Sequence, residues 1–150
     1  MKAMLVTRHG GPDVLEMREV ADPAPASGEV VVRVKAVAMN HLDIWVRKGL
    51  PTLSLPLPHV LGCDIAGVVE DSGGVAGIDV GAEVVIAPGT SCGRCRECAL
   101  GRDHFCRAYQ ILGEHRWGGN AEKIRGPAAN VLPKPKRLSF EEAAAVPLVF

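Results

Sequence analysis

Alternating apolar and polar residues predict that the chain is built mainly from short β-strands. Segment 30–37 has the period of two and the β-branched residues that are typical of a half-buried strand. The apolar run 3–6 is followed by the turn signal Gly10-Gly11-Pro12 and by an imperfect alternation over 14–20, which predicts a hairpin. Further strands are expected at 65–69 and 84–86, between glycine turns, and an extended segment is expected from Gly118 to Ile124.

Two segments carry helix signals. Residues 40–48 have apolar side chains at helical spacing, with Asn40 able to cap the start and Gly49 able to end the helix. Ser139 and Glu142 have the spacing of a capping box, and three alanines follow, so a second helix is expected to begin there. The predicted fold class is therefore mainly β with a few short helices.

Four of the five cysteines fall within a short stretch, and this cluster is the strongest chemical signal in the chain. They are Cys92, Cys95, Cys98 and Cys106, and Cys63 stands apart. Two successive Cys-x-x-Cys steps can direct three sulfurs at one centre, and Cys106 can complete a tetrahedron. Because thiolates fill all four positions of such a site, we expect a structural Zn²⁺ that takes no part in chemistry.

Two other fates of these thiols stay open. The first is an iron–sulfur cluster, but the common bacterial run closes with a three-residue gap and Cys-Pro, whereas here the last gap is seven residues and Arg107 follows. The second is disulfides or free thiols, which a reducing compartment makes less common than metal ligation. Four arginines in or beside the lobe can offset the excess negative charge of a zinc tetrathiolate; they are Arg94, Arg96, Arg102 and Arg107.

Composition narrows the classes of partner. The 17 basic residues balance the 17 acidic ones, so no surplus of positive charge favours a nucleic-acid partner or an acidic membrane surface. The longest apolar stretch, 30–39, contains Arg33 and Lys35 and is far too short for a membrane span. The first residues lack the apolar segment of a secretory signal, so we expect a cytoplasmic, reducing location.

Several further segments, taken in order with the cysteine cluster, give the chain a family resemblance. It resembles the N-terminal catalytic domain of the medium-chain dehydrogenase/reductases, the superfamily of zinc-containing alcohol dehydrogenases and quinone oxidoreductases. The resemblance implies a GroES-like, partly open β-barrel that carries a structural-zinc lobe. The segments that carry it are 30–39, Asn40-His41-Leu42-Asp43, 58–69, 81–85, the cysteine lobe, 118–122 and 139–144.

The resemblance also implies an organisation and a reaction. Residues 1–138 would form the substrate-side domain, with the zinc lobe at 89–108, and 139–150 would start the helix leading to a cofactor-binding Rossmann domain. No Gly-x-Gly-x-x-Gly turn occurs in the 150 residues, so we expect that domain to lie outside the sequence shown. The implied activity is hydride transfer between NAD or NADP and a small alcohol, aldehyde or ketone, by a homo-oligomer, either a dimer or a tetramer.

The family's catalytic-zinc pattern is altered in this chain. The pattern has a Cys at Asn40, a His-Glu pair at Cys63-Asp64, a proton-relaying hydroxyl at Leu42 and a further ligand within 147–150, where the chain offers none. The patterns Asn40-x-x-Asp43 and Gly62-x-Asp64 are more like those of the zinc-free quinone and enone reductase branch, in which hydrogen bonds polarise the substrate carbonyl.

Each of these residues has a functional and a plainer interpretation. Asn40 would donate to the substrate or cap a helix, and Cys63 would be a residual ligand or a small buried side chain. His41 lies where the family often contacts the cofactor pyrophosphate, and its alternative is an exposed helix-start residue. The competing functions are a quinone or enone reductase without catalytic zinc and, from another class, a non-catalytic, zinc-stabilised binding module.

Overall fold

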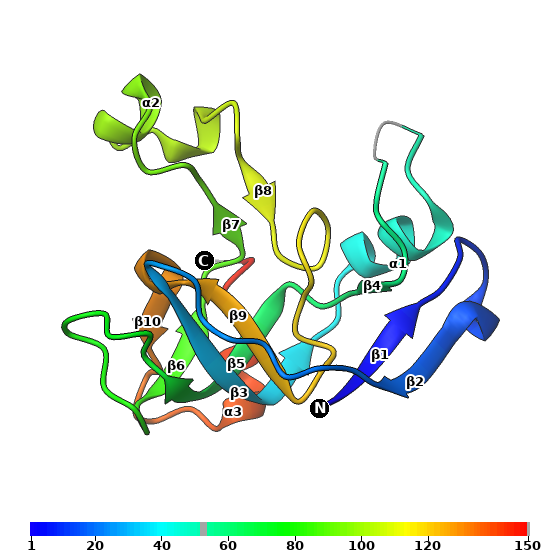
Figure 1. Ribbon diagram of the computed structural model, residues 1–150, viewed down its shortest axis with the longest axis horizontal. Helices are drawn as coiled ribbons and strands as arrows, with labels where there is room; N and C mark the ends of the chain where they lie inside the picture. The colour runs from blue at the N-terminus through cyan, green and yellow to red at the C-terminus, as the bar shows by residue number, and fades with distance from the viewer. Residues whose placement is uncertain (52–53, 150) are drawn as a thin grey trace.

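A hairpin and a neighbouring strand form the first of three sheets in the computed structural model, which describes residues 1–51 and 54–149. Strand β1 (Lys2–Val6) pairs antiparallel with β2 (Leu15–Glu19), and a 3-10 turn, η1 (Pro12–Val14), joins them. On its other side β1 pairs with β4 (His59–Val60). The predicted hairpin is confirmed, and it lies on one side of the molecule (Figure 1).

The second sheet has five antiparallel strands in the order β10-β6-β5-β3-β9. Its long central members, β3 and β5, pair over most of their length, and β6 and β9 flank them. Pro127 and Pro133 fall in the two edge strands, where a residue without an N–H breaks no ladder. The strands are β3 (Glu29–Ala38), β5 (Asp64–Asp71), β6 (Glu83–Ile86), β9 (Lys123–Pro127) and β10 (Val131–Pro133), and the 3-10 turn η3 (Ala128–Asn130) connects the last two.

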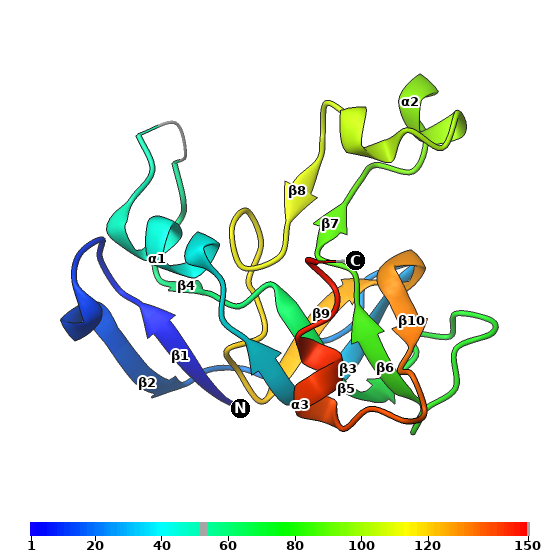
Figure 2. The ribbon, with the colours of Figure 1, turned by 180° about the vertical axis from the view of Figure 1, so that it is seen from behind.

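The two faces of this sheet bury different side chains. Helix α3 (Phe140–Ala144) packs Ala143 and Ala144 against Ala66 and Val85, and Figure 2 shows it lying against the sheet. Ser139 and Glu142 close the predicted capping box at its start. The alternate residues of the strands supply the larger core, which comprises Val30, Val32, Ile65, Val69, Val84, Ile86, Leu112 and Ile124.

Helix α1 (His41–Lys48) packs Val46 against Val6 and Val14 of the hairpin. As predicted, Asn40 is its N-cap residue, and Gly49 ends it with a φ of 94°, a backbone conformation that glycine adopts without strain. The helix joins the end of β3 to the loop before β4, and so it holds the 40–43 segment beside the start of β5.

The third sheet is the base of a lobe that projects from the barrel (Figure 1). Strands β7 (Gly89–Thr90) and β8 (Gln110–Ile111) pair at this base, and the short helices α2 (Arg96–Ala99) and η2 (Asp103–Phe105) lie beyond it. In the described part of the chain no helix is long and apolar enough to span a bilayer.

The extended segment that was expected to begin at Gly118 enters the sheet later than predicted. Regular pairing begins only at Lys123, because the amides of Gly118 and Gly119 donate to the carbonyls of Val60 and Gly62. The chain therefore runs against the 60–62 loop before it enters the sheet. A Cβ on Gly118 would collide with the carbonyl oxygens of Gly62 and Leu61, which explains the glycine.

Candidate metal centre and candidate active site

The four clustered cysteines converge on one point in the lobe. Cys92 follows β7, Cys95 and Cys98 lie at the start and within α2, and Cys106 follows η2. Their four sulfur atoms all lie within 4.8 Å of one another. In the described residues this is the one group of three or more candidate ligands.

The spacing of the sulfurs fits a tetrahedral zinc ion. A Zn–S bond of about 2.3 Å places tetrahedral sulfurs about 3.8 Å apart. The Sγ atoms of Cys92 and Cys98 are 3.9 Å apart, and those of Cys95 and Cys98 are 3.5 Å apart. The amides of Cys92 and Ala108 point at the sulfur of Cys106, at 3.5 and 3.4 Å, as N–H groups do around metal-bound thiolates.

The lobe also favours thiolates at two of the four positions. The backbone N–H groups of Arg94 and Cys95 lower the pKa of Cys92 to about 6. The pKa of Cys98 is also lowered, mainly by a hydrogen bond from the Ser91 hydroxyl. Because zinc binds the deprotonated thiol, these donors prepare the site for a cation.

Two other residues of the cysteine lobe have contacts of their own. The Arg102 side chain lies 3.1 Å from the Glu97 carboxylate, so part of its charge is already balanced within the lobe. His104 is outside the ligand cluster, and its exposed ring packs on Phe105 with centroids 4.3 Å apart. The ligand set is therefore all-thiolate.

A second polar cluster joins the start of α1 to the start of β5. Asn40 Nδ2 lies 3.0 Å from Asp64 Oδ2 and 3.3 Å from Cys63 Sγ. Cys63 and Asp64 are buried, and the other carboxylate oxygen of Asp64 has no hydrogen-bond partner. The backbone of Leu148 lies near the Asp64 carboxylate and opposes the rise in its pKa, so residues from three distant segments meet here.

The electrostatics of this cluster favour neutral groups. Burial raises the pKa of the Cys63 thiol to about 12, and the nearby Asp64 and Asp43 carboxylates add to the shift. Burial also raises the pKa of Asp64, and the hydrogen bond from Asn40 only partly offsets this rise. Zinc would have to displace the proton of this buried thiol before Cys63 could ligate the ion.

Sequence reasoning missed the role of Asp43, which is the residue that holds this cluster in place. Asp43 is 3% exposed, its Oδ1 accepts from the Gly62 amide at 2.8 Å, and its Oδ2 accepts from the Asn40 amide at 2.7 Å. One carboxylate thus ties the N-terminus of α1 to the loop that leads into Cys63. The capping-box spacing of Asn40 and Asp43 was a signal for the contact with the Asn40 amide, and nothing in the sequence signalled the contact with Gly62.

Two other predicted positions, His41 and Leu42, have contacts elsewhere. His41 is exposed on α1, and its ring centroid lies 6.0 Å from that of Trp45. Leu42 packs into the apolar cluster between α1 and the hairpin, so it has a structural place. Within the predicted ligand segment 147–150, Phe150 lies outside the described residues.

A further buried polar residue is His59. His59 on β4 is 1% exposed, and its ring nitrogens have no side-chain or backbone partner of good geometry in the described residues. Burial lowers the pKa of His59 and outweighs the opposite effect of the Gly113 backbone. Burial therefore favours the neutral ring.

Comparison with known proteins gives one consistent result. Residues 26–136 match the model of the alcohol dehydrogenase GroES-like domain. A solved structure described as an NAD-dependent alcohol dehydrogenase superposes with a TM-score of 0.95 at 58% identity, over 99% of this chain and 43% of that one.

Two curated relatives differ in the reaction that their names state. An alcohol dehydrogenase of Geobacillus stearothermophilus is 37% identical over 97% of this chain and 43% of its own length. An acryloyl-coenzyme A reductase of Metallosphaera sedula is 32% identical over 99% of this chain and 44% of its own length. The chain therefore spans less than half the length of these relatives.

Proposed function

The chain belongs to the family of alcohol dehydrogenase GroES-like domains, and from that premise we propose that it is the substrate-side part of an NAD(P)-dependent oxidoreductase. The reaction would be hydride transfer between a nicotinamide and a small alcohol, aldehyde or ketone. The observation that carries the proposal is the match of almost the whole chain to an NAD-dependent alcohol dehydrogenase at 58% identity. The mainly β fold and the GroES-like architecture expected from the sequence are confirmed.

The division of labour within the enzyme stays a prediction. Residues 1–138 would hold the substrate side of the cleft, and 139–150 would lead to the cofactor-binding part of a longer protein. A homo-oligomer and a cytoplasmic location likewise stay predictions from the resemblance.

The lobe would hold one structural zinc ion per chain. The sulfur spacing and the amide donors around Cys92, Cys98 and Cys106 support this assignment. Bound there, zinc would cross-link a segment that has little core of its own, because its helices bury few side chains. It would fold the lobe and take no part in hydride transfer.

The residues at the family's catalytic-zinc position do not fit that metal. Asn is a weak zinc ligand, the Cys63 thiol resists ionisation, and Leu148 stands beside Asp64 without a donor side chain. This donor set favours a second candidate function, the reduction of a quinone or enone without catalytic zinc. The acryloyl-coenzyme A reductase among the relatives is consistent with conjugated substrates.

Asn40 would then polarise the substrate carbonyl. Its amide points at the sulfur of Cys63, which is a weak acceptor, so a carbonyl oxygen could replace that contact with a stronger hydrogen bond. Asp64 would keep the Asn40 amide oriented. The exposed His41, one residue further on, would face the cofactor phosphates.

One experiment on the full-length protein separates these functions. The protein is assayed with NAD(H) and with NADP(H) against a panel of alcohols and a panel of enones, and Asn40→Ala is compared with the unaltered protein. Turnover of alcohols supports the dehydrogenase, whereas turnover of enones alone with a large loss of kcat in Asn40→Ala supports the zinc-free reductase. If the full-length protein binds neither NAD(H) nor NADP(H), both catalytic functions are excluded and the non-catalytic binding module is the function that is left.

A further inference from the structure

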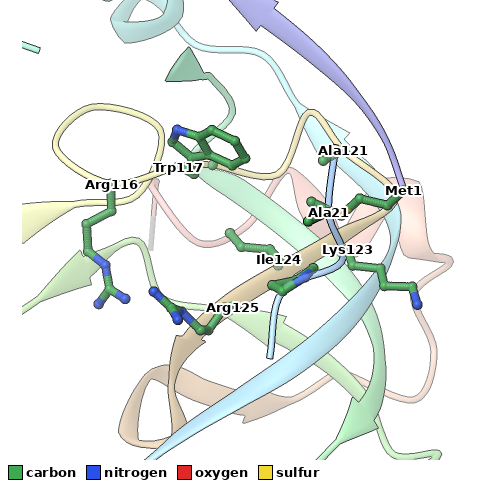
Figure 3. Close-up of a pocket in the computed structure, with 10 residues that line it drawn as sticks. Met1, Ala21, Arg116, Trp117, Ala121, Lys123, Ile124 and Arg125 are labelled. Atoms are coloured by element: carbon green, nitrogen blue, oxygen red, sulfur yellow. The ribbon is translucent and has the colours of Figure 1, made fainter. Parts of the chain in front are cut away.

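A cavity beside β9 is lined by cations and apolar surface. Its volume is about 410 Å³, and Figure 3 shows its lining. Trp117, which is 41% exposed, forms one wall, and the buried Ile124 lies between its ring and the charged groups. No acidic residue lines it in the described part of the chain, and the cations that line it are Arg116, Lys123 and Arg125 together with the amino terminus at Met1.

The cations of the cavity fall into two groups. Figure 3 shows the guanidinium groups of Arg116 and Arg125 at one end and the Lys123 side chain pointing away at the other. Lys123 lies 2.6 Å from Asp22 and 2.5 Å from Glu70, and the ammonium of Met1 lies 2.7 Å from the same Asp22, so two cations face two carboxylates. The lysine end therefore carries no excess positive charge.

The arginine end keeps one positive charge. Glu29 pairs with both guanidiniums: its Oε1 accepts a hydrogen bond from Arg116 Nη2 at 2.5 Å, and its Oε2 lies 3.0 Å from Arg125 Nε as an ion pair without hydrogen-bond geometry. In the described residues it is the one carboxylate within salt-bridge distance of either arginine. Two cations and one anion leave a unit charge, and because a guanidinium has five N–H donors, most donors of the pair remain available.

This pairing also orients the arginines. The Glu29 side chain is 14% exposed and comes from the start of β3, whereas Arg125 comes from the neighbouring strand β9 and Arg116 from the loop before it. Because the carboxylate anchors both guanidiniums, a ligand would meet donors that are already ordered, and it would lose less entropy on binding.

We propose that this cavity is a binding site for a small planar aromatic carboxylate. Its carboxylate would take the free N–H donors of Arg116 and Arg125, in the bidentate geometry that arginine favours. Its ring would lie against Trp117 and Ile124, where stacking on the indole adds to the burial of apolar surface. A single carboxylate matches the single unbalanced charge, whereas a phosphate dianion has one charge too many.

The test uses benzoate as the probe and the two tryptophans of the chain as reporters. In ¹H–¹⁵N spectra of the zinc-loaded chain, benzoate should shift the indole N–H signal of Trp117. The signal of Trp45, on α1 and outside the cavity, should stay in place. Trp45→Phe assigns the two signals.

Matched ligands and variants test the charge and the ring separately. Neutral benzamide and non-aromatic acetate should each bind at least tenfold more weakly than benzoate. Arg116→Gln and Arg125→Gln should each weaken benzoate binding about tenfold, and Arg137→Gln, an exposed arginine outside the cavity, should leave it unchanged. Glu29→Gln keeps a side-chain oxygen that can still hold a guanidinium but raises the unbalanced charge of the arginine pair from one to two, so it should tighten benzoate binding.

Three results would overturn the proposal. They are an unmoved Trp117 signal in the unaltered chain, equal binding of benzamide and benzoate, and tighter binding of inorganic phosphate than of benzoate. Misfolding of the arginine variants would weaken benzoate binding, but it would not explain tighter benzoate binding by Glu29→Gln. The two results together therefore separate the proposal from a general loss of folding.

Discussion

Replacing Asp43 by Ala should destabilise the chain more than any exposed acidic substitution. The carboxylate is 3% exposed and accepts two backbone N–H groups, from Asn40 and from Gly62. In Asp43→Ala the buried Gly62 amide loses its partner, which costs about 1–3 kcal/mol. The partly buried Asn40 amide also loses its acceptor, which is equivalent to losing a helix cap and costs about 1 kcal/mol more.

The expected loss is therefore about 2–4 kcal/mol in the free energy of unfolding. For a chain of this size each kcal/mol corresponds to about 2–4 °C, so a loss of about 3 kcal/mol lowers Tm by about 6–12 °C. Asp43→Asn keeps one acceptor oxygen but turns an amide NH₂ toward the second N–H donor, so it should fall between Ala and the unaltered chain.

Urea unfolding followed by circular dichroism, with zinc in excess, measures this loss. Asp13→Ala is the matched control, because Asp13 is an exposed partner of Arg8 and its removal should cost less than about 1 kcal/mol. Zinc content should be the same in all variants, since the lobe is untouched. An Asp43→Ala chain within about 0.5 kcal/mol of the unaltered one would refute the argument that this carboxylate joins α1 to the 61–63 loop.

Three further predictions follow from other residues. Burial lowers the folded-state pKa of His59 below its unfolded value, so its contribution to stability is present above about pH 6.5 and is lost as the pH falls; His59→Phe should flatten this acid limb of the urea-midpoint profile, and an unchanged slope would contradict it. Gly118→Ala should destabilise by about 2 kcal/mol or more, because a Cβ there meets the carbonyl oxygens of Gly62 and Leu61; Gly126→Ala, with open space at its Cβ, is the thermal-shift control. Zinc chelation should raise hydrogen exchange in 91–108 while the β3 and β5 amides stay protected, and equal exchange in both regions would show that the metal holds the whole domain.

Local signals made much of this fold predictable. The strand at β3, the helix after Asn40 and the capped start of α3 each depend on residues within a few positions of one another. The cysteine lobe was also predictable, because ligand spacing in sequence constrains the geometry of a metal site. Strands β4, β7 and β8 escaped prediction because two residues are too few to show a period.

Contacts between distant segments were not predictable in this way. Asp43 reaches Gly62, 19 residues further on, and Arg116 reaches Glu29 across 87 residues. Neither spacing carries a motif, so only the folded chain reveals the carboxylate that positions the Asn40 cluster or the charge left at the Arg116–Arg125 pair. The family resemblance placed Asn40, Cys63 and Asp64 at one site, but it gave no reason for their mutual hydrogen bonds.

Zinc content per chain tests the central claim most directly, because the claim assigns a metal to the cysteine lobe and denies one to the Asn40 cluster. Atomic emission analysis of the purified, dialysed protein should find about one zinc per chain, and Cys95→Ser should remove it while Cys63→Ser leaves it in place. Two zinc ions per chain, one of them lost in Cys63→Ser, would contradict the account.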